Sequence, residues 1–285
     1  MQQLPPEEIL PVVRAALAED VGSGDITTLS TVPESAVAEG RVVAREPLVV
    51  AGVAVAEAVF REVSPRVAVR FEKTEGARAG AGEPLMSVRG PAAALLTGER
   101  VALNFLQRMC GVATLTRQYV DAVAGTRAVI LDTRKTTPGL RRLEKYAVLC
   151  GGGRNHRFGL HDAVLIKDNH LTALRDAEPN PIAAAVRRVR ERFPGRTVEV
   201  EADNLEQVDQ AVAAGADIVL LDNMPPDVLR EAVRRVGVRA RTEASGGVNL
   251  QTVRGIAETG VDCISVGALT HGARAMDIAL DFEAA

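Results

Sequence analysis

The pattern of hydrophobic and polar positions changes about halfway along the chain. Residues 5–20 carry apolar positions at helical spacing behind an acidic first turn, so they predict a helix. Residues 36–88 contain short strand-like apolar runs punctuated by glycine, with a helix predicted from 53 to 61. A long helical stretch follows over residues 91–125. This half therefore predicts a small α+β domain.

After Thr126, strand and helix patterns alternate regularly. Six short apolar runs are separated by helical patterns that begin with Asn or Pro and end near Gly, as helix boundaries require. The runs are RAVILDTRK, AVLIKDNH, TVEVEAD, DIVLLDNM, RTEASGG and CISVGA. Strands that alternate with helices in this way form a parallel sheet with right-handed crossovers. The fold class predicted for this half is α/β.

Each predicted strand of this half ends in polar residues or glycine. These residues are Asp132, Arg134, Lys135, Lys167, Asp168, Glu201, Asp222, Ser245 and Gly267. In a barrel, the carboxyl ends of all strands converge on one mouth, where (β/α)₈ enzymes carry out their chemistry. In an open doubly wound sheet these ends would be spread out, with a ligand only at the switch point. The polar strand ends favour a barrel, and six strands instead of eight predict an open, incomplete α/β barrel.

The overall charge excludes several classes of partner. The net charge is −3, from 34 basic and 37 acidic residues, so no global field attracts nucleic acid or an anionic membrane. Only 3% of residues are aromatic and none is Trp, which disfavours base stacking. No apolar run approaches the roughly 20 residues of a membrane span, and the first residues lack a signal-peptide pattern. We expect a cytoplasmic protein whose Cys110, Cys150 and Cys263 are buried thiols.

Cationic residues from three separate segments predict an anion site. They are Arg134, Lys135, His156, Arg157 and Lys167. Guanidinium groups bind carboxylate or phosphate in a bidentate manner, and each charged hydrogen bond contributes roughly 1.5–3 kcal/mol. A metal site of His156, His161 and His170 is disfavoured by their spacing, so the latter two are expected to be hydrogen-bonded structural residues. The stretch LRRLEKY is expected to be a solvated helix face with charge pairs.

Acidic and small residues near the later strand ends suggest a second ligand. Glu201 and Asp222 can hold Mg²⁺ or stabilise a cationic transition state, although capping of the next helix or pairing with arginine is an alternative. The turn of Ser245, Gly246 and Gly247 precedes a predicted helix, and SVGALTH repeats the arrangement. A helix N-terminus with small residues suits a phosphate, and barrels often bind phosphate near their last strands.

Several motifs, in this order and spacing, closely resemble those of the quinolinate phosphoribosyltransferase family. They are EDVGSGDITT, GERVALNFLQRMCGVAT, DTRKTTPGLRRLEKYAV, GGGRNHRFGLHDAVLIKDNH, VEVE, LLDNM, EASGGV and SVGALTH. The resemblance extends over nearly the whole chain. It implies an N-terminal α+β sandwich domain over residues 1–109, an open α/β barrel over 110–272, and a C-terminal helix over 273–285 that returns to the first domain.

The resemblance also implies an activity and an assembly. The family joins quinolinate to 5-phosphoribosyl 1-pyrophosphate with Mg²⁺, giving nicotinate mononucleotide, pyrophosphate and carbon dioxide, a step in NAD biosynthesis. It implies a homodimer, leaving a higher oligomer open, in which the N-terminal domain of one subunit covers the barrel mouth of the other. Arg100 matches the arginine that the family contributes across this interface.

The resemblance assigns a role to each matching residue. Arg134, His156, Arg157 and the partner's Arg100 are expected to bind the quinolinate carboxylates. Lys135 and Lys167 are expected to lie between the acid and the donor, with Glu201 and Asp222 near the ribose and as ligands of Mg²⁺. These last four are the expected catalytic residues. The residues expected around the 5′-phosphate are Ser245, Gly246, Gly247, Gly267 and His271.

Three alternatives remain open at this point. The first is a related phosphoribosyltransferase that uses another acidic ring. The second is a barrel aldolase in which Lys167 forms a Schiff base with a carbonyl substrate. The third is a protein that binds the anion without catalysis, which the number of polar residues at the barrel mouth disfavours.

Overall fold

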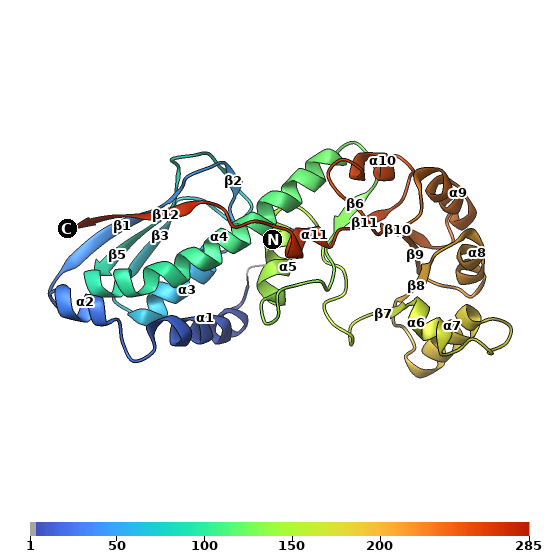
Figure 1. Cartoon of the computed structure of the whole chain (residues 1–285), viewed down its shortest axis with the longest axis horizontal. Coiled ribbons are helices and arrows are strands. Elements are labelled where there is room, and N and C mark those ends of the chain that lie inside the picture. The colour runs from blue at the N-terminus through green and yellow to red at the C-terminus, as the bar shows by residue number, and fades with distance from the viewer. Residues whose placement is uncertain (1–3, 285) are drawn as a thin grey trace. The chain divides into compact units, whose positions relative to one another are not determined.

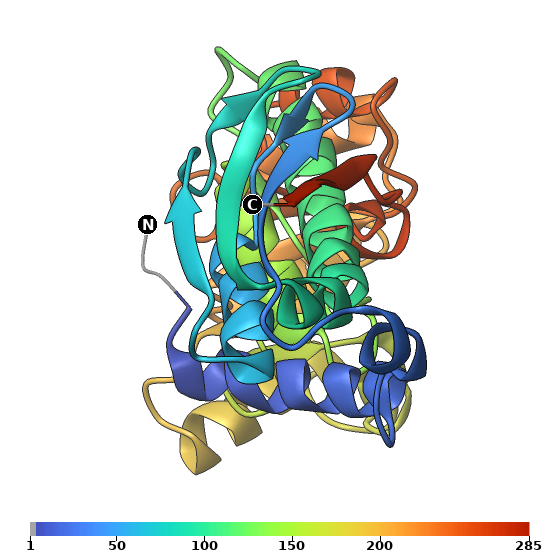
Figure 2. The same ribbon diagram turned by 90° about the vertical axis from the view of Figure 1, so that its left-hand side faces the viewer.

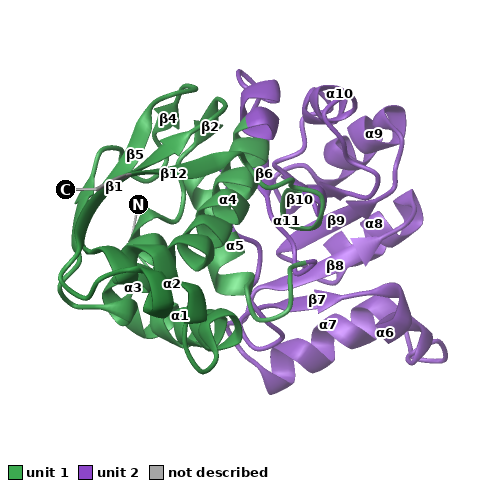
Figure 3. Ribbon diagram, turned by 60° about the vertical axis from the view of Figure 1, so that its left-hand side comes forward, with its two compact units in different colours: residues 1–117, 136–152, 269–285 green, residues 118–135, 153–268 purple. Residues whose placement is uncertain are grey.

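The computed structural model describes residues 4–284 (Figure 1). They fall into two compact units (Figure 3). Unit 1 comprises residues 1–117, 136–152 and 269–285, and unit 2 comprises residues 118–135 and 153–268. The predicted domain boundary at residue 110 falls inside one uninterrupted helix, α4, Ala92–Ala122.

Unit 1 combines helices with antiparallel strands. Its elements are α1 Pro6–Val21, α2 Ile26–Thr31, β1 Val37–Ala44, β2 Leu48–Val49, α3 Val53–Val63, β3 Ala68–Phe71, β4 Arg78–Ala79, β5 Pro84–Pro91, most of α4, α5 Arg141–Cys150, most of α11 Ala268–His271 and β12 Ile278–Ala284. A four-stranded sheet has the order β12-β1-β5-β3, and β2 pairs with β4. Figure 2 shows strands of this sheet passing in front of helix α4. The predicted α+β sandwich is confirmed.

The C-terminal segment is a strand, so the predicted helix over residues 273–285 is wrong. Ile278, Leu280 and Phe282 are apolar at every second position, which is the period of a strand. The strand β12 pairs antiparallel with β1, with Ala44 opposite Ile278. Gln107 on α4 also donates its side-chain amide to the Ile278 carbonyl at 2.9 Å. The segment does return to unit 1, but it extends the sheet there.

Helix α5 is more deeply buried than predicted. Leu143, Glu144 and Lys145 are all buried, with Glu144 only 1% exposed, so the expectation of a solvated face for LRRLEKY is wrong. Arg108 on α4 forms an ion pair with Glu144 (Nη2 to Oε1, 2.7 Å). The Thr137 backbone N–H donates to Glu144 Oε2 at 3.0 Å. Charged residues can be buried here because their partners are buried with them.

Unit 2 is an alternating α/β unit. Its elements are β6 Val129–Leu131, β7 Val164–Ile166, α6 Asp168–Thr172, α7 Pro181–Arg192, β8 Val198–Ala202, α8 Leu205–Ala213, β9 Ile218–Asp222, α9 Pro226–Val236, β10 Arg241–Ser245, α10 Val253–Ala257 and β11 Cys263–Ser265. The six predicted strands all form, and they make one parallel sheet in the order β6-β11-β10-β9-β8-β7. In the described residues β6 and β7 do not pair with each other, so the barrel is open, as predicted.

Strand register divides this sheet into two chemically different faces. Glu201 lies opposite Leu220, which lies opposite Glu243, and residues opposite each other share a face. We call this the inner face, and its residues are Glu199, Glu201, Leu220, Asp222, Glu243 and Ser245. The other face is mostly apolar, with Thr242 as a polar member. Residues on it that are at most 2% exposed include Val198, Val200, Val219, Leu221, Ala244 and Ile264. Helices α7 to α10 pack against the strands there (Figure 3), so burial of this apolar face stabilises the unit.

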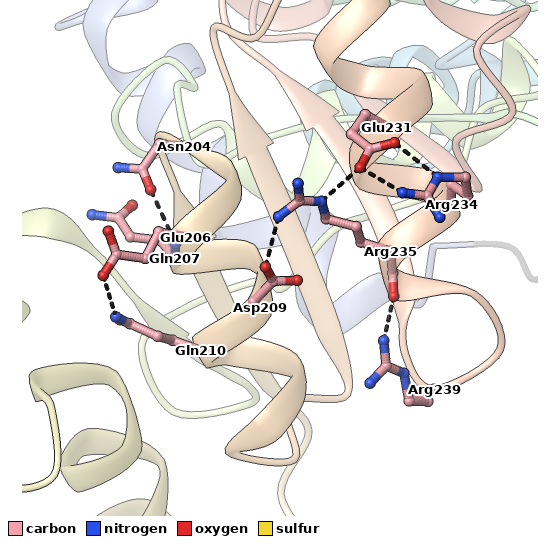
Figure 4. Close-up of polar contacts among 9 residues, drawn as sticks. All are labelled: Asn204, Glu206, Gln207, Asp209, Gln210, Glu231, Arg234, Arg235 and Arg239. Atoms are coloured by element: carbon pink, nitrogen blue, oxygen red, sulfur yellow. Dashed lines mark hydrogen bonds and ion pairs between the residues drawn. The ribbon is translucent and has the colours of Figure 1, made fainter.

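Polar contacts also connect neighbouring helices on the outside of unit 2 (Figure 4). Arg235 on α9 reaches Asp209 on α8 at 2.7 Å and Glu231 on its own helix at 2.8 Å. Arg234 also bonds Glu231, and these guanidinium groups lower the pKa of Glu231 to about 2. Asn204 caps α8 by accepting the Gln207 backbone N–H at 3.0 Å. Exposed ion pairs contribute little stability, so the apolar contacts beneath them hold the helices in place.

Two further expectations concern membranes and cysteines. None of the helices in residues 4–284 combines the length and apolar character of a membrane span. Cys110 and Cys150 are buried thiols, as predicted, whereas Cys263 is only partly buried.

Candidate active site

Lys167, Glu201 and Asp222 come together at the carboxyl ends of neighbouring strands. Lys167 Nζ lies 3.3 Å from Glu201 Oε2, and the Glu201 side chain is only 12% exposed. Burial raises the pKa of Glu201, the Lys167 ammonium lowers it, and the nearby Asp222 carboxylate raises it again. Asp222 Oδ2 accepts the side-chain amide of Asn223 at 2.7 Å. The arrangement places an ammonium group and two carboxylates at one edge of the sheet.

The Arg134 and Arg157 side chains lie near enough for the charge of one to affect the other. Burial lowers the pKa of Arg157, and the Arg134 guanidinium lowers it further. Arg157 Nη1 donates to the Ala163 carbonyl at 3.3 Å, which leaves most of its donors for other partners. Among the described residues, the buried Nε of Arg134 has no hydrogen-bond partner. Two like charges and an unsatisfied buried donor favour the binding of an anion between these side chains.

Asp132, at the end of β6, fixes the loop that carries His156 and Arg157. Its carboxylate is fully buried and accepts the His156 backbone N–H at 2.8 Å and the Asn155 side-chain amide at 2.6 Å. Lys135, three residues further along, is exposed. Because the loop is tied to a strand end, the orientation of Arg157 follows from the position of the sheet.

Both ring nitrogens of His156 are engaged within the protein. The Arg157 backbone N–H donates to Nδ1 at 2.8 Å, and Nε2 lies 2.9 Å from Glu199 Oε2. The side chain is only 12% exposed. Sequence reasoning placed His156 directly on the substrate carboxylates. In this structure the ring links the loop to the buried Glu199, and the expected role of His156 at the substrate carboxylates remains a prediction.

The glycine turn after β10 does not stand at a helix start, so that part of the prediction is wrong. Helix α10 begins only at Val253, and the intervening turn is organised by Asn249, whose Oδ1 accepts the Thr252 N–H at 3.0 Å. Gly246 has φ +90°, and a Cβ there would lie 2.1 Å from Asn223 Oδ1. Gly246 thus allows the turn to approach Asn223, directly beside Asp222.

The functions of the other predicted site residues remain predictions, and their positions are as follows. Ser245 and Gly267 lie at the carboxyl ends of β10 and β11 and Gly247 follows Gly246, in the same unit as Glu201. Arg100 on α4 and His271 on α11 are exposed residues of unit 1. His170 accepts the Lys167 backbone N–H on Nδ1 at 2.9 Å and so caps α6, a structural role. His161 is exposed.

Sequence reasoning missed two acids, Glu199 and Glu243. They are 3% and 1% exposed and lie on the inner face, each two residues before a predicted site residue on the same strand. That spacing is the signal that could have identified them, because residues two apart on a strand share a face. With His156 they form a group whose candidate ligand atoms all lie within 4.8 Å of one another.

Sequence comparison decides the family. The profile of the quinolinate phosphoribosyl transferase N-terminal domain matches residues 25–110, and that of the C-terminal domain matches residues 112–281. The chain belongs to the quinolinate phosphoribosyl transferase family. The two family domains together span most of the chain, in the same order as the sandwich and the barrel.

Individual members of the family agree with this membership. The nicotinate-nucleotide pyrophosphorylase (carboxylating) of Mycobacterium leprae is 49% identical over 277 residues, covering 94% of this chain and 95% of that protein. A probable enzyme of the same name from Bacillus subtilis is 43% identical, covering 92% and 89%. The solved structure of NadC from Streptococcus pyogenes has a TM-score of 0.95 and 37% identity over 100% of both chains. The fold of the family is therefore the fold of this chain.

Proposed function

We propose that the protein transfers the phosphoribosyl group of 5-phosphoribosyl 1-pyrophosphate to quinolinate, with loss of carbon dioxide. The products are nicotinate mononucleotide, used in NAD biosynthesis, and pyrophosphate. Membership of the quinolinate phosphoribosyl transferase family supports this activity. The observation that carries it is the pair of Arg134 and Arg157, which suits an anionic guest and lies in the same unit as Lys167, Glu201 and Asp222.

Quinolinate is a planar dianion, and the cationic pair suits it. Guanidinium groups bind carboxylates through two parallel hydrogen bonds, and partial burial strengthens each of these bonds. Binding of the acid would satisfy the buried Nε of Arg134 and relieve the repulsion between the two guanidinium groups. Lys167, which already contacts Glu201, would lie between the acid and the sugar donor.

The carboxylates suit the donor half of the reaction. As pyrophosphate leaves, positive charge develops on the ribose ring, and Glu201 and Asp222 would stabilise it electrostatically. The turn of Ser245, Gly246 and Gly247 lies beside Asn223, with Gly247 exposed, and its backbone N–H groups would bind the 5′-phosphate. Gly267 follows the adjacent strand end and would contribute in the same way. These residues bind and orient, and no covalent intermediate with the protein is needed.

Glu201 and Asp222 also fit Mg²⁺, which prefers carboxylate oxygens and retains water for phosphate groups to replace. Burial and Asp222 both raise the pKa of Glu201, and an added cation would offset both effects. When bound, Mg²⁺ would neutralise charge on the departing pyrophosphate.

The chemistry of carbon dioxide loss follows from the attack itself. The pyridine nitrogen forms the bond to the ribose and becomes cationic. The electron pair left when the adjacent carboxylate departs is stabilised by that cationic ring, and a proton then replaces the lost group. The role of Arg134 and Arg157 in this step is to hold the ring so that its nitrogen faces the sugar.

We further propose that the active enzyme is a homodimer in which Arg100 of each subunit completes the site of the other. Arg100 is exposed on α4, and an exposed arginine is suited to reach a bound carboxylate in another subunit. Mixing an Arg100→Ala variant with an Arg134→Ala variant should restore activity, since each hybrid dimer contains one intact site. Failure of the mixed sample to exceed both parents, when hybrid dimers form, would contradict the shared site.

The deciding experiment measures nicotinate mononucleotide and carbon dioxide from quinolinate, donor and Mg²⁺. Arg134→Ala and Arg157→Ala should each raise the KM for quinolinate on the order of tenfold or more, with a much smaller change for the donor. Arg239→Ala, on the outer surface, is the matched control and should change neither constant. Turnover of nicotinate without quinolinate turnover, or trapping of Lys167 by borohydride with a carbonyl substrate, would overturn the proposal. Binding of quinolinate without any turnover would also overturn it.

A further inference from the structure

Glu199 and Glu243 form a buried acid pair that the proposed reaction does not use directly. Glu199 lies on β8 and Glu243 on β10, and both belong to the inner face. Each is two residues before a predicted site residue, Glu201 and Ser245 respectively. The pair therefore lies deeper in the sheet than the strand ends where the substrates are expected.

The two acids share few partners. His156 Nε2 is 2.9 Å from Glu199 Oε2 and 3.6 Å from Glu243 Oε1. Within the described residues, Oε1 of each glutamate has no hydrogen-bond partner, although both atoms are buried. The candidate ligand atoms of the two carboxylates and of His156 all lie within 4.8 Å of one another. Burial, followed by the charge of Glu199, raises the pKa of Glu243, which also makes a side-chain hydrogen bond with Glu199.

The backbone fixes the proton of His156. Because the Arg157 N–H donates to Nδ1, the ring proton is on Nε2 and points at Glu199. A metal ion bound to Nε2 would require the proton on Nδ1, directly against the Arg157 N–H. A doubly protonated ring would meet the same conflict. The contacts therefore favour a neutral histidine that donates to Glu199, and they disfavour a metal centre of these three residues.

The chain of contacts ends at Arg157. His156 Nδ1 holds the Arg157 backbone N–H, and the negative charge of Glu199 favours the cationic form of the Arg157 guanidinium. Asp132 holds the same loop through the His156 N–H. Loss of Glu199 would release the imidazole ring and, with it, one of the two anchors of this loop.

We propose that Glu243 and Glu199 act through His156 as positioning residues for Arg157, and thereby set how tightly the carboxylates of the acid substrate are bound. This inference rests on the proposed function, because it assigns Arg157 to the acid substrate. Neither glutamate contacts a substrate. Their effect is selective, since the contacts lead to the acid-binding arginine and not to Lys167 or Asp222.

Substitutions that preserve or remove the hydrogen-bonding groups of Glu243 and Glu199 test the proposal. Glu243→Gln keeps an N–H donor toward Glu199, so the KM for quinolinate should stay within about twofold of wild type. Glu243→Leu removes a hydrogen-bond donor, and Glu199→Leu removes an acceptor. In both variants the KM for quinolinate should rise on the order of tenfold, while the KM for 5-phosphoribosyl 1-pyrophosphate changes less than about twofold. Val200→Ala, on the apolar face of β8, is the control for a general loss of packing. If Glu199→Leu raised the KM for quinolinate and the KM for 5-phosphoribosyl 1-pyrophosphate by the same factor, the proposal would be overturned.

Two measurements do not depend on turnover. The chain has only four histidines, so nitrogen NMR of the labelled protein, with His156→Asn for assignment, identifies the ring state. We expect a neutral ring with its proton on Nε2; a proton on Nδ1 would contradict the network. Metal analysis of the purified protein should find no tightly bound transition metal that Glu243→Leu removes, and finding one would replace this proposal with a metal site.

Failure of this inference can be distinguished from failure of the proposed function. If the wild-type protein does not convert quinolinate, the proposed function fails, whatever the variants do. If it does convert quinolinate but Glu199→Leu and Glu243→Leu leave its KM unchanged, only the positioning role fails. Calorimetric titration of quinolinate into the same variants gives the affinity directly and should follow the KM values.

Discussion

Replacing Arg108 with methionine should strongly destabilise the protein. Its Nε and Nη2 both donate to Glu144 Oε1, at 3.0 and 2.7 Å, and Nη1 donates to the Ala273 carbonyl at 2.7 Å. Its Nη2 also donates to the Thr270 carbonyl. One side chain therefore joins α4, α5 and the C-terminal segment of unit 1. The methionine retains apolar bulk but leaves the Glu144 carboxylate without its cation.

The expected cost follows from burial. Glu144 is 1% exposed, and the Arg108 side chain is 27% exposed, so solvent screens this pair only weakly. Removing one partner of a buried ion pair costs about 3–5 kcal/mol, because the remaining charge stays desolvated. Each kcal/mol lowers the thermal midpoint by about 2–4 °C for domains of 150–250 residues, so we expect a decrease of about 6–20 °C. The Thr137 N–H and hydroxyl still bond Glu144, which favours the lower half of this range.

Urea unfolding at pH 7, followed by circular dichroism, measures this cost. The double variant Arg108→Met, Glu144→Met removes both charges and should be more stable than the sum of its single variants predicts, by more than about 1 kcal/mol. Arg61→Met, at the more exposed pair with Glu57, is the matched control and should cost less than about 1 kcal/mol. The reasoning is refuted if Arg108→Met costs no more than that control, or if the two single effects simply add.

Three further predictions follow from the same structure. Burial and a neighbouring carboxylate raise the pKa of Glu243 from 4.5 to about 8, so the folded protein keeps a proton that the unfolded chain releases. Stability should therefore fall as pH rises from about 4.5 through about 8; Glu243→Gln should remove this part of the slope in urea titrations at pH 5, 7 and 9. Gly246→Ala should raise the KM for the phosphoribosyl donor more than that for quinolinate, since the new Cβ at positive φ displaces Asn223; unchanged kinetics would contradict the role of this turn. Asn204→Ala removes the cap of α8 and should cost about 1 kcal/mol in urea unfolding, whereas Asn204→Asp, which keeps the cap, should not.

The elements of the barrel could be predicted from sequence because their signals are local. Each of the six strands is a short apolar run bounded by turn residues, and each polar strand end adjoins it directly. The C-terminal strand β12 was missed because the family resemblance implied a helix there, although the local alternation of apolar residues indicates a strand. Its partner β1 is distant in sequence: Arg45 and Asp281, which form an ion pair beside this pairing, are 236 residues apart. The burial of Glu144 depends in the same way on Arg108, which lies 36 residues earlier.

In the candidate site, too, features set by residues near in sequence could be predicted, whereas features set by distant residues could not. The proximity of Lys167, Glu201 and Asp222 follows from parallel strands ending at one edge, which the sequence pattern predicts. The engagement of both His156 nitrogens could not be predicted, because it depends on a backbone N–H and on an acid 43 residues away. The predicted roles of Arg100 and His271 remain to be tested by the mixing experiment and by substitution.

The two faces of the six-stranded sheet also matter for engineering. Positions that face the helices carry mostly aliphatic side chains, and several of the neighbouring positions on the same strands carry carboxylates or hydroxyls. Substrate preference and thermal stability thus depend on alternate residues of the same strands. A library that varies only inward positions can search for new acceptor acids while leaving the hydrophobic layer intact, and a library of the other positions can seek thermal tolerance without altering the chemistry.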